Sequence, residues 1–589
     1  MTDADWIRRF RAAAVTFPSW ARDDPDRLIY LTNSSGTFEV HEWDRRAGTH
    51  RQATDRPEGT GYRVPSQLDR TGTTLWWFDD RKGNELGHWM RQPFGGGPAV
   101  PLAAQLPPAY SAGLAIGSGF VVVGRSRGDE GTTVDRIQDD DVRRLYAHAQ
   151  SASVGALSAD ERFIPIVHSE RGDSRNRAIR VLDVEGRTVA ELDAGPGRGY
   201  LPWSRWSPVR GDGRLLVHHD LTGLRRPAIL DLPTGLCHEI PLELPGETTA
   251  DWYPAADALL VGHDHRGRTE LYRYDLATGA LEALSTERGT IGSARVRPDG
   301  AVWYMLDRSS APAAVRAVGQ GVVLAPAGDG APAGVSYTDH DVAGIHCFVA
   351  RPSGAGPDPT LFLIHGGPAA HDRDAFSPAV QAWVDHGFAV VLVNYRGSSG
   401  YGKAWLDAIV GRPGLTELED IAAVQDWAIV QGIADPARCA ITGGSWGGYL
   451  TLLALGVQPE RWACGIGVVP IGDYVAAFED EMEPLKRYDA ALFGGTPEDA
   501  AESYRRSNPL TYADRVRAPL LMLVGANDPR CPARSVDVYG ARLRELGIPF
   551  EEYRYDAGHG SLVIEERIRQ MRLELEFAER VLRAAAAVA

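Results

Sequence analysis

Residues 441–450, ITGGSWGGYL, decide the expected fold of this chain. The apolar run at residues 439–442 predicts a buried strand, and residues 449–455 predict an apolar helix. Between them stands Ser445, with a glycine two residues to either side in a G-x-S-x-G pattern. A serine on such a sharp turn has strained backbone, so these neighbours must lack side chains. The pattern therefore predicts an exposed nucleophilic hydroxyl beside a helix N-terminus.

Two later segments supply the partners that a serine nucleophile needs. An apolar run at residues 520–524 leads into a loop with Asp528, and a strand-like segment at residues 550–555 leads into a loop with His559. Serine is a poor nucleophile until a base takes its proton. We expect His559 to be that base and Asp528 to orient it and stabilise the imidazolium. The order serine, acid, histidine along the chain is that of the α/β-hydrolase fold.

A fourth segment predicts the oxyanion hole. The apolar strand of LFLIHGGPAA, residues 361–370, runs into a loop with the sequence HGGP. The fold takes one backbone N–H from this loop, which we assign to Gly367, and another from Trp446, the residue after the nucleophile. His365 is expected to orient the loop rather than to act as a second base.

Together these segments resemble the prolyl oligopeptidase family of serine peptidases. The shared motifs are HGGP at 365–368, NYRGSSGYG at 394–402, GGSWGGY at 443–449, GANDPRCP at 525–532 and GHG at 558–560. HGGP and the D-x-R after the acid are most similar to the acylaminoacyl peptidase and bacterial dipeptidyl-aminopeptidase-like branch. The motifs cover about the last 250 residues. The resemblance implies a seven-bladed propeller before the hydrolase.

The chain from about residue 25 to residue 325 repeats one pattern of short strands. A short apolar strand, often closing on Asp or His, begins at positions 28, 75, 120, 163, 215, 259 and 302, at intervals of 43 to 52 residues. A D-x-x-x-G turn recurs at Asp44, Asp231 and Asp275. Seven units, each holding about four short strands, predict a seven-bladed β-propeller independently of the resemblance. A stacked sandwich is the alternative, which the recurrence disfavours.

At 589 residues the chain is too long for one hydrophobic core, so at least two domains are expected. We place an N-terminal helical segment at residues 1–20, the all-β propeller at 21–330 and the α/β-hydrolase catalytic domain at 331–589. The hydrolase is expected to contain a doubly wound, mostly parallel sheet. Trp6, Phe10 and Phe17 recur at helical spacing, and the resemblance implies that this first helix packs on the hydrolase.

Charge and composition limit the partners. A net charge of -16 argues against nucleic acid and anionic membranes, and no apolar run approaches the ~18 residues of a membrane span. The N-terminus shows no signal-peptide core. The five cysteines and sixteen histidines show no metal-ligand spacing, so we expect neither metal nor cofactor, and reduced thiols in a cytoplasm. The sequence leaves the oligomeric state open, a homo-oligomer included.

The resemblance also points to residues that contact substrate. It places the S1 pocket between the elbow and the acid, where the matching positions are Tyr474 and Phe478. Aromatic walls would favour an apolar or aromatic P1 side chain. Arg530 matches an arginine that in relatives binds the P2 carbonyl or acyl oxygen, and a structural salt bridge is the alternative. The acidic run at residues 479–483 is left unassigned, because such runs are usually solvated.

The sequence therefore predicts a serine peptidase that acts through an acyl-enzyme on Ser445. The resemblance implies short peptides or peptide-like amides, cut near the N-terminus by an aminopeptidase, dipeptidyl or acylaminoacyl peptidase, with the propeller as a cap that excludes folded proteins. One alternative is a carboxylesterase or small-molecule amidase that inactivates an aminoacyl drug or metabolite. A more remote alternative is a non-catalytic propeller binding protein.

Overall fold

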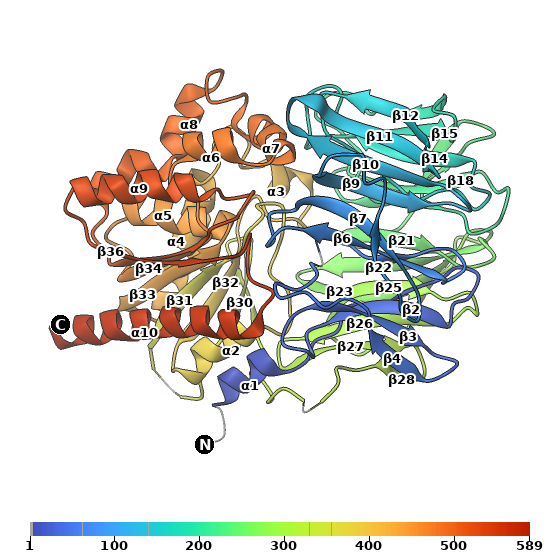
Figure 1. The fold of residues 1–589 in the computed structure, drawn as a ribbon. Helices are drawn as coiled ribbons and strands as arrows, with labels where there is room; N and C mark the ends of the chain where they lie inside the picture. The colour runs from blue at the N-terminus through green and yellow to red at the C-terminus, as the bar shows by residue number, and fades with distance from the viewer. Residues whose placement is uncertain (1–3, 62, 140, 329, 355, 589) are drawn as a thin grey trace.

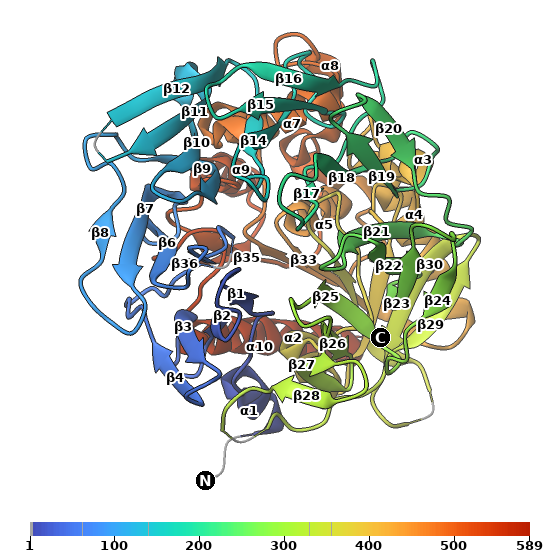
Figure 2. The same cartoon turned by 90° about the vertical axis from the view of Figure 1, so that its right-hand side faces the viewer.

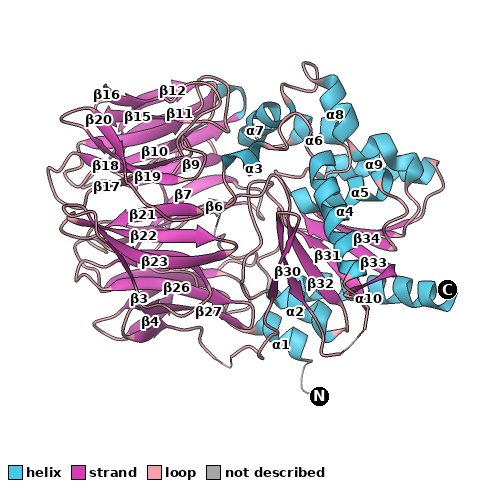
Figure 3. Cartoon of the chain, turned by 180° about the vertical axis from the view of Figure 1, so that it is seen from behind, coloured by secondary structure: helices cyan, strands magenta, loops and turns pink. Residues whose placement is uncertain are grey.

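The structure, a computed structural model, describes residues 4–61, 63–139, 141–328, 330–354 and 356–588. Two parts of the molecule lie against each other (Figure 1). The first part is built of antiparallel strands, and the second of helices around a central sheet, as the colours of Figure 3 distinguish. The expected combination of a strand-rich part and a C-terminal α/β part is therefore present.

The sheets of the first part form a ring when the molecule is viewed end-on (Figure 2). Its described residues form five four-stranded sheets and one of eight strands, each from strands that are consecutive in the chain. The four-stranded sheets are β1 to β4 (Ser19–Trp20, Arg27–Thr32, Glu39–Asp44, Thr49–Gln52), β13 to β16 (Ala152–Val154, Phe163–His168, Ala178–Asp183, Thr188–Leu192), β17 to β20 (Arg205–Trp206, Arg214–His219, Arg226–Asp231, Leu236–Glu239), β21 to β24 (Glu247–Trp252, Ala258–His265, Arg268–Asp275, Leu281–Ala283) and β25 to β28 (Thr290–Val296, Val302–Arg308, Ala311–Ala317, Gly321–Leu324).

The eight-stranded sheet consists of two groups of strands with a short contact between them. The groups are β5 to β8 (Gln67–Leu68, Thr74–Asp80, Leu86–Pro93, Val100–Pro101) and β9 to β12 (Ala109–Ile116, Val121–Arg127, Gly131–Gln138, Asp141–His148). A short 3-10 turn, Gly128–Glu130, connects β10 to β11. The groups join where β7 pairs with β9 at two positions, Leu86 with Tyr110 and Gly87 with Ala109. Within the second group, by contrast, β10 pairs with β11 at seven positions.

The second strand of a sheet in this ring is apolar on both faces, because it packs between two neighbouring sheets. In β18, Leu215, Leu216 and Val217 are fully buried. Leu215 and Val217 join the cluster that includes Ile179 of the preceding sheet, whereas Leu216 joins the cluster that includes Leu259 of the following sheet. The near-continuous apolar runs of the sequence thus reflect strands with no solvated face.

The ring closes by side-chain packing between its first and last sheets. Trp43 of β3 and Trp303 of β26 lie in one hydrophobic cluster with their ring centroids 6.1 Å apart. The guanidinium of Arg297 lies over the Trp303 ring at 4.4 Å and donates a hydrogen bond to the Pro25 carbonyl at 3.0 Å. Since each described sheet uses consecutive strands, no strand crosses this seam between the two ends of the ring.

The second part is organised around an eight-stranded sheet of order β29-β30-β32-β31-β33-β34-β35-β36. β29 and β30 pair antiparallel at one edge, and the strands from β32 to β36 pair parallel. Their bounds are Thr338–Val342, Ile345–Ala350, Asp358–Ile364 (β31), Ala389–Asn394 (β32), Ala434–Gly444, Cys464–Val468, Leu520–Gly525 and Phe550–Tyr555. This is the mostly parallel sheet that the sequence predicts.

Helices cover both faces of this sheet. In β35, Leu520 and Met522 face a cluster with α4, α5 and α9, while Leu521 and Leu523 face a cluster with α1, α2 and α10. Side chains on a strand alternate between faces, so one apolar strand serves two layers. The helices are α1 (Asp5–Arg11), α2 (Pro378–Asp385), α3 (Lys403–Asp407), α4 (Leu415–Val430), α5 (Trp446–Val457), α6 (Tyr474–Asp480), α7 (Glu483–Phe493), α8 (Ala501–Ser507), η2 (Pro509–Arg515, a 3-10 helix), α9 (Ala533–Glu545) and α10 (Ile564–Val588).

The N-terminal helix is shorter than the predicted helical segment. α1 ends at Arg11 because the backbone turns extended at Ala12, with ψ of 133°. Trp6 and Phe10 pack with α2 and α10 in the second part, and Arg9 donates to Asp385 at 2.5 Å. Phe17, by contrast, packs on the seam cluster of the ring. The segment therefore spans both parts of the molecule instead of forming one helix.

None of the helices in the described part of the chain is long and apolar enough to cross a lipid bilayer. The five cysteines have free thiols, and four of them are buried.

Candidate active site

Ser445 stands at a turn that only this arrangement of glycines allows. β33 ends at Gly444 and α5 begins at Trp446, so Ser445 is the single residue between strand and helix, at φ 58° and ψ -120°. A Cβ at Gly447 would lie 2.0 Å from the carbonyl oxygen of Ile364, well inside van der Waals contact. The glycine of the motif is therefore required by the close approach of β31, as well as by the turn itself.

Asp528 and His559 form a directly bonded pair. The Asp528 Oδ2 accepts a hydrogen bond from His559 Nδ1 at 2.7 Å, and Asp528 is fully buried. The other carboxylate oxygen, Oδ1, accepts from the backbone N–H groups of Arg530 at 2.8 Å and Cys531 at 3.0 Å. With Nδ1 held by the carboxylate, Nε2 is the imidazole nitrogen left to exchange a proton.

Ser445 lies beside the loop that carries Asp528, but among the described residues no hydrogen bond joins its hydroxyl to His559. Ser445 Oγ lies 3.9 Å from Cys531 Sγ, on the same loop as Asp528. Burial, with the nearby charge of Asp528, raises the pKa of the Cys531 thiol well above its usual range, so the sulfur stays protonated. One donor atom each of Asp528, Cys531 and His559 lies within 4.8 Å of the others. A metal there would need the thiolate and would compete for the bonded carboxylate, so the geometry fits an acid–base pair better.

The HGGP loop lies directly against the elbow. A Cβ at Gly366 would stand 2.9 Å from the Gly444 carbonyl oxygen and 3.2 Å from Ser445 Cβ. The next residue, Gly367, has φ 135° and is joined to Pro368 by a cis peptide bond. Trp446, the other residue expected in the oxyanion hole, is the first residue of α5, where backbone N–H groups have no partner within the helix. Both expected donors thus belong to segments beside the nucleophile.

His365 is held inside the protein and supports this loop. Its Nε2 bonds the Ser398 hydroxyl at 2.8 Å, its ring stacks on Tyr395 at 4.2 Å, and the Tyr395 hydroxyl donates to the His365 carbonyl at 2.8 Å. Burial lowers the pKa of His365 to about 4, so the ring is neutral near pH 7. These contacts suit a residue that orients the loop.

A buried carboxyl group supports the other side of the elbow. The indole of Trp446 donates to Glu417 Oε1 of α4 at 3.2 Å. Burial raises the pKa of Glu417 to about 8, so this group is protonated at neutral pH. The sequence alone gives no sign of this role, because Glu417 lies in the first turn of α4, where acidic residues are common.

Arg530 makes the salt bridge that the sequence left as an alternative. Its guanidinium donates to both carboxylate oxygens of Glu85, at 2.6 and 2.7 Å, from the turn between β6 and β7 in the ring. Arg63 approaches the same carboxylate at 3.7 Å and donates to the backbone carbonyl of His559 at 3.0 Å. Glu85 and Arg63 were missed by sequence reasoning, since 445 residues separate Glu85 from Arg530 and no motif marks it.

The same turn of the ring packs on the loop that carries His559. A Cβ at Gly558 would lie 1.9 Å from the Gly83 carbonyl oxygen. Lys82 forms an ion pair with Asp556, which also accepts from the Asn527 amide at 3.0 Å. The strand-rich part therefore contacts the loop that carries His559.

Tyr474 and Phe478, the expected S1 residues, lie on α6 near the elbow. Tyr474 is 1% exposed, and its ring centroid is 6.2 Å from that of Trp446 and 5.1 Å from that of Tyr449. Phe478 is half-buried and packs edge-on against Tyr504 at 5.9 Å. Tyr474 thus belongs to the aromatic packing under the elbow, and Phe478 lies further along the helix.

The acidic run at residues 479–483 does not behave uniformly. Glu479 and Asp480 are exposed and pair with Arg534, as expected of a solvated face. Glu481 is only 4% exposed, so this interpretation is wrong for that residue. Burial and the neighbouring Asp489 raise the pKa of Glu481, and burial raises the pKa of Asp489 to about 7. The sequence could not separate Glu481 from its neighbours, because burial depends on α7 folding over it.

A family model and curated proteins share sequence similarity with this chain. Residues 374–585 match the prolyl oligopeptidase family. Among curated relatives, Dipeptidyl peptidase family member 6 of Caenorhabditis elegans is 36% identical over 218 residues, which are 35% of this chain and 29% of that protein. Dipeptidyl aminopeptidase BIII of Pseudoxanthomonas mexicana is 26% identical over 583 residues, 91% of this chain and 76% of that protein. The chain thus spans under a third of the first relative and about three quarters of the second.

Solved structures extend the likeness to the whole chain. A puromycin hydrolase superposes with a TM-score of 0.82 at 22% identity, covering 99% of this chain and 96% of that one. The acylaminoacyl peptidase of Pyrococcus horikoshii superposes with a TM-score of 0.72 at 18% identity, covering 98% and 97%. At these identities the likeness shows the two-part fold.

Proposed function

We propose that the protein is a serine peptidase that hydrolyses short peptides or peptide-like amides near the N-terminus, because residues 374–585 match the prolyl oligopeptidase family. The observation that carries the proposal is the 2.7 Å bond between His559 Nδ1 and Asp528 Oδ2, beside a serine held at φ 58° on a strand-to-helix turn. Relatives named as dipeptidyl aminopeptidase and acylamino-acid-releasing enzyme support cleavage near the N-terminus.

The proposed mechanism is acyl transfer in two steps. Ser445 Oγ attacks the scissile carbonyl carbon while His559 Nε2 takes the hydroxyl proton. The oxyanion is held by the backbone N–H groups of Gly367 and Trp446. His559 then gives its proton to the leaving amine, which departs and leaves an ester on Ser445. A water molecule, deprotonated by His559, attacks that ester. The bond between Ser445 Oγ and the acyl carbon breaks, Ser445 Oγ takes the proton back from His559, and the acid is released, while Asp528 holds the imidazole in place.

We propose the ring to be a seven-bladed β-propeller that caps this site, within domain bounds of 21–330 for the propeller and 331–589 for the hydrolase after an N-terminal segment of residues 1–20. The two-position pairing of β7 with β9 supports counting the eight-stranded sheet as two blades. The contact between Gly83 and Gly558 supports a cap that reaches the catalytic loop. The packing of Trp6 and Phe10 on α2 and α10 supports placing the first helix on the hydrolase.

Three residues are proposed to contact substrate. Tyr474 and Phe478 would line an S1 pocket whose aromatic walls favour an apolar or aromatic side chain. Arg530, with two of its donors fixed by Glu85, would present its remaining N–H groups to a substrate carbonyl oxygen. The free thiols of the five cysteines support a reducing, cytoplasmic location for the enzyme.

The first test compares purified protein with its Ser445→Ala variant on a matched panel of substrates. The panel contains aminoacyl, N-acetyl-aminoacyl and dipeptidyl anilides with one P1 residue, and a p-nitrophenyl ester. We expect anilide hydrolysis that falls more than about a thousand-fold in the variant, the usual cost of losing a triad member. Ester cleavage alone would favour the carboxylesterase alternative, and retained anilide activity in the variant would overturn the mechanism.

A further inference from the structure

A cavity of about 1310 Å³ runs through the ring. Residues of β1, β5, β9, β13, β17, β21 and β25, the first strand of each group of four, line it. Its far end is formed by the second part of the molecule, at residues 369–371, Arg373 and Ser399. Residues 369–373 follow the HGGP loop directly, so the cavity leads toward the nucleophile. Ser445, Asp528 and His559 are not among its described lining residues, which makes it a space in front of the site.

The charge inside the cavity is opposite to that of the whole protein. The chain has a net charge of -16, yet six arginines and four acidic residues line the cavity. Several of these arginines are neutralised locally. Arg70, for example, donates to Asp23 at 2.6 Å and to Glu161 at 3.2 Å, and Arg225 pairs with Glu247.

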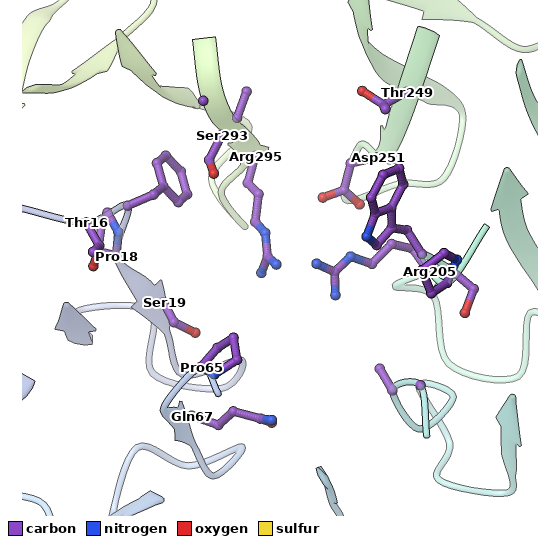
Figure 4. Close-up of a pocket in the computed structure, with 18 of the residues that line it drawn as sticks. Thr16, Pro18, Ser19, Pro65, Gln67, Arg205, Thr249, Asp251, Ser293 and Arg295 are labelled. Carbon is purple, nitrogen blue, oxygen red and sulfur yellow. The ribbon is translucent and has the colours of Figure 1, made fainter. Parts of the chain in front are cut away.

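Arg205 and Arg295 differ from Arg70 and Arg225, whose guanidinium groups bind carboxylates. Figure 4 shows their guanidinium groups pointing toward each other across the cavity. Among the residues that the structure describes, neither guanidinium has an ion pair or a hydrogen bond. The positive charge of Arg205 is the main reason that the pKa of Arg295 is lowered to about 10, and burial adds to the shift. Asp251 acts in the opposite direction and more weakly, so the pair remains repulsive.

We propose that Arg205 and Arg295 form a carboxylate site that binds the C-terminus of a short peptide inside the cavity. Two facing guanidinium groups offer a fork of N–H donors on each side, which suits a carboxylate bound between them. A bound anion would also remove the repulsion between the two cations. The cavity is large enough for several residues, and Trp203, which is 50% exposed, adds an apolar surface to its lining.

The choice of a peptide as the source of the carboxylate rests on the proposed function. A peptide whose C-terminus is held in the ring directs its other end toward the HGGP loop and Ser445. The site would therefore favour cleavage near the N-terminus of peptides with a free carboxylate, and would bind blocked C-termini poorly.

The kinetic test compares the tripeptide Phe-Ala-Ala with its C-terminal amide. We expect the wild-type protein to prefer the free acid by about ten-fold or more in kcat/KM, the scale of a charge-assisted hydrogen-bonded contact. The double variant R205Q/R295Q should lose this preference while keeping its activity on an aminoacyl anilide, which has no carboxylate. The matched control is Arg22→Gln, a cavity arginine already held by the Ala159 and Pro208 carbonyls, which should keep the preference. An acid-to-amide ratio near one in the wild type, or an unchanged ratio in the double variant, would overturn the proposal.

A binding measurement separates this site from the peptidase activity. Calorimetric titration of the Ser445→Ala protein with Phe-Ala-Ala, its amide and sodium sulfate needs no turnover. Binding of the acid that is lost in R205Q/R295Q supports the site even if no peptide is hydrolysed, in which case only the proposed function fails. If sulfate binds, and the acid and the amide bind with equal affinity, the arginine pair is a site for inorganic anions and the peptide assignment is overturned. Because Arg295 faces Arg205 and, among the described residues, no ion pair or hydrogen bond holds its guanidinium, Arg295→Gln should not lower the thermal midpoint, and a clear fall would contradict this description of the site.

Discussion

The elbow with Ser445 and the loop with His559 carry the two side chains that we propose to react, yet they are held in different ways. Ser445 is fixed by its own domain, since its N–H donates to the Val468 carbonyl at 2.9 Å and β31 presses on Gly447. His559 lies on a loop that touches the ring, through Gly83 against Gly558 and Arg63 on the His559 carbonyl. The position of Ser445 thus depends on local backbone, whereas the position of His559 depends on how the two parts of the molecule pack together.

The largest effect is expected at the elbow. Gly447→Ala puts a Cβ 2.0 Å from the Ile364 carbonyl oxygen, which neither backbone can relieve without breaking the turn. We expect loss of measurable hydrolysis and a fall of about 4 kcal/mol or more in the free energy of unfolding. Gly444→Ala is the matched control, because its Cβ meets nothing nearer than the Val468 carbonyl at 3.9 Å. Equal stability and activity in both variants, by urea unfolding and anilide assay, would contradict the elbow as described.

A smaller but still large effect is expected where the domains meet. Gly558→Ala forces the loop away from the Gly83 carbonyl, 1.9 Å from the new Cβ, while the elbow stays intact. A displacement of about 1 Å at His559 should lower kcat/KM about 100-fold. Gly330→Ala, whose Cβ meets nothing within 4 Å, is the control for the substitution itself. Wild-type kinetics for Gly558→Ala would show that the histidine loop tolerates a shifted propeller.

Removing one charge at the same contact should have a moderate effect. Glu85→Gln leaves the turn intact but removes the anion that holds Arg530 and Arg63. We expect about a ten-fold fall in kcat/KM and a loss of about 1–3 kcal/mol in stability, since Glu85 is largely buried. Lys82→Gln breaks an exposed ion pair in the same turn and should change kcat/KM less than two-fold. If both variants change kcat/KM by the same factor, the buried Glu85–Arg530 pair contributes no more to activity than an exposed ion pair.

The smallest effect on rate is expected behind the elbow, where it appears as a dependence on pH. Burial raises the folded-state pKa of Glu417 to about 8, from about 4.3 for a free glutamate. Because ionising Glu417 costs more in the folded state, its contribution to the free energy of unfolding is fully present below pH ~4 and is lost as the pH rises toward 8. Glu417→Gln keeps an oxygen acceptor for the Trp446 indole and cannot ionise. We expect it to be about 1–3 kcal/mol more stable than wild type at pH 8, with little difference at pH 4.

The measurement for Glu417 is urea unfolding of both proteins between pH 4 and pH 8. Other buried carboxyl groups, such as Asp489, titrate in both proteins and cancel in the difference. Parallel stability curves would show that Glu417 does not titrate in this range. Activity at pH 7 should change only a few-fold.

What the sequence could predict follows the same division. The G-x-S-x-G pattern, the acid loop and the histidine loop are local features whose stereochemistry leaves a signature in adjacent residues, and residues 374–585, which contain all three, match the prolyl oligopeptidase family. The apolar second strands reveal the repeating units for the same reason. The Glu85–Arg530 pair, the burial of Glu481 and the early end of α1 arise from contacts between distant segments. No pattern of neighbouring residues encodes those contacts.

The seam of the ring has a consequence for chain topology. Both ends of the ring are attached to the second part of the molecule. Just before β1, α1 packs on α2 and α10, and after β28 the chain continues into the central sheet at β29. Among the residues that the structure describes, no strand pairs the first sheet of the ring with the last, so the second part of the molecule holds the two ends of the ring together. Cleaving the chain at either attachment should therefore weaken the packing of Trp43 on Trp303. We expect the two parts to unfold together on heating or during proteolysis.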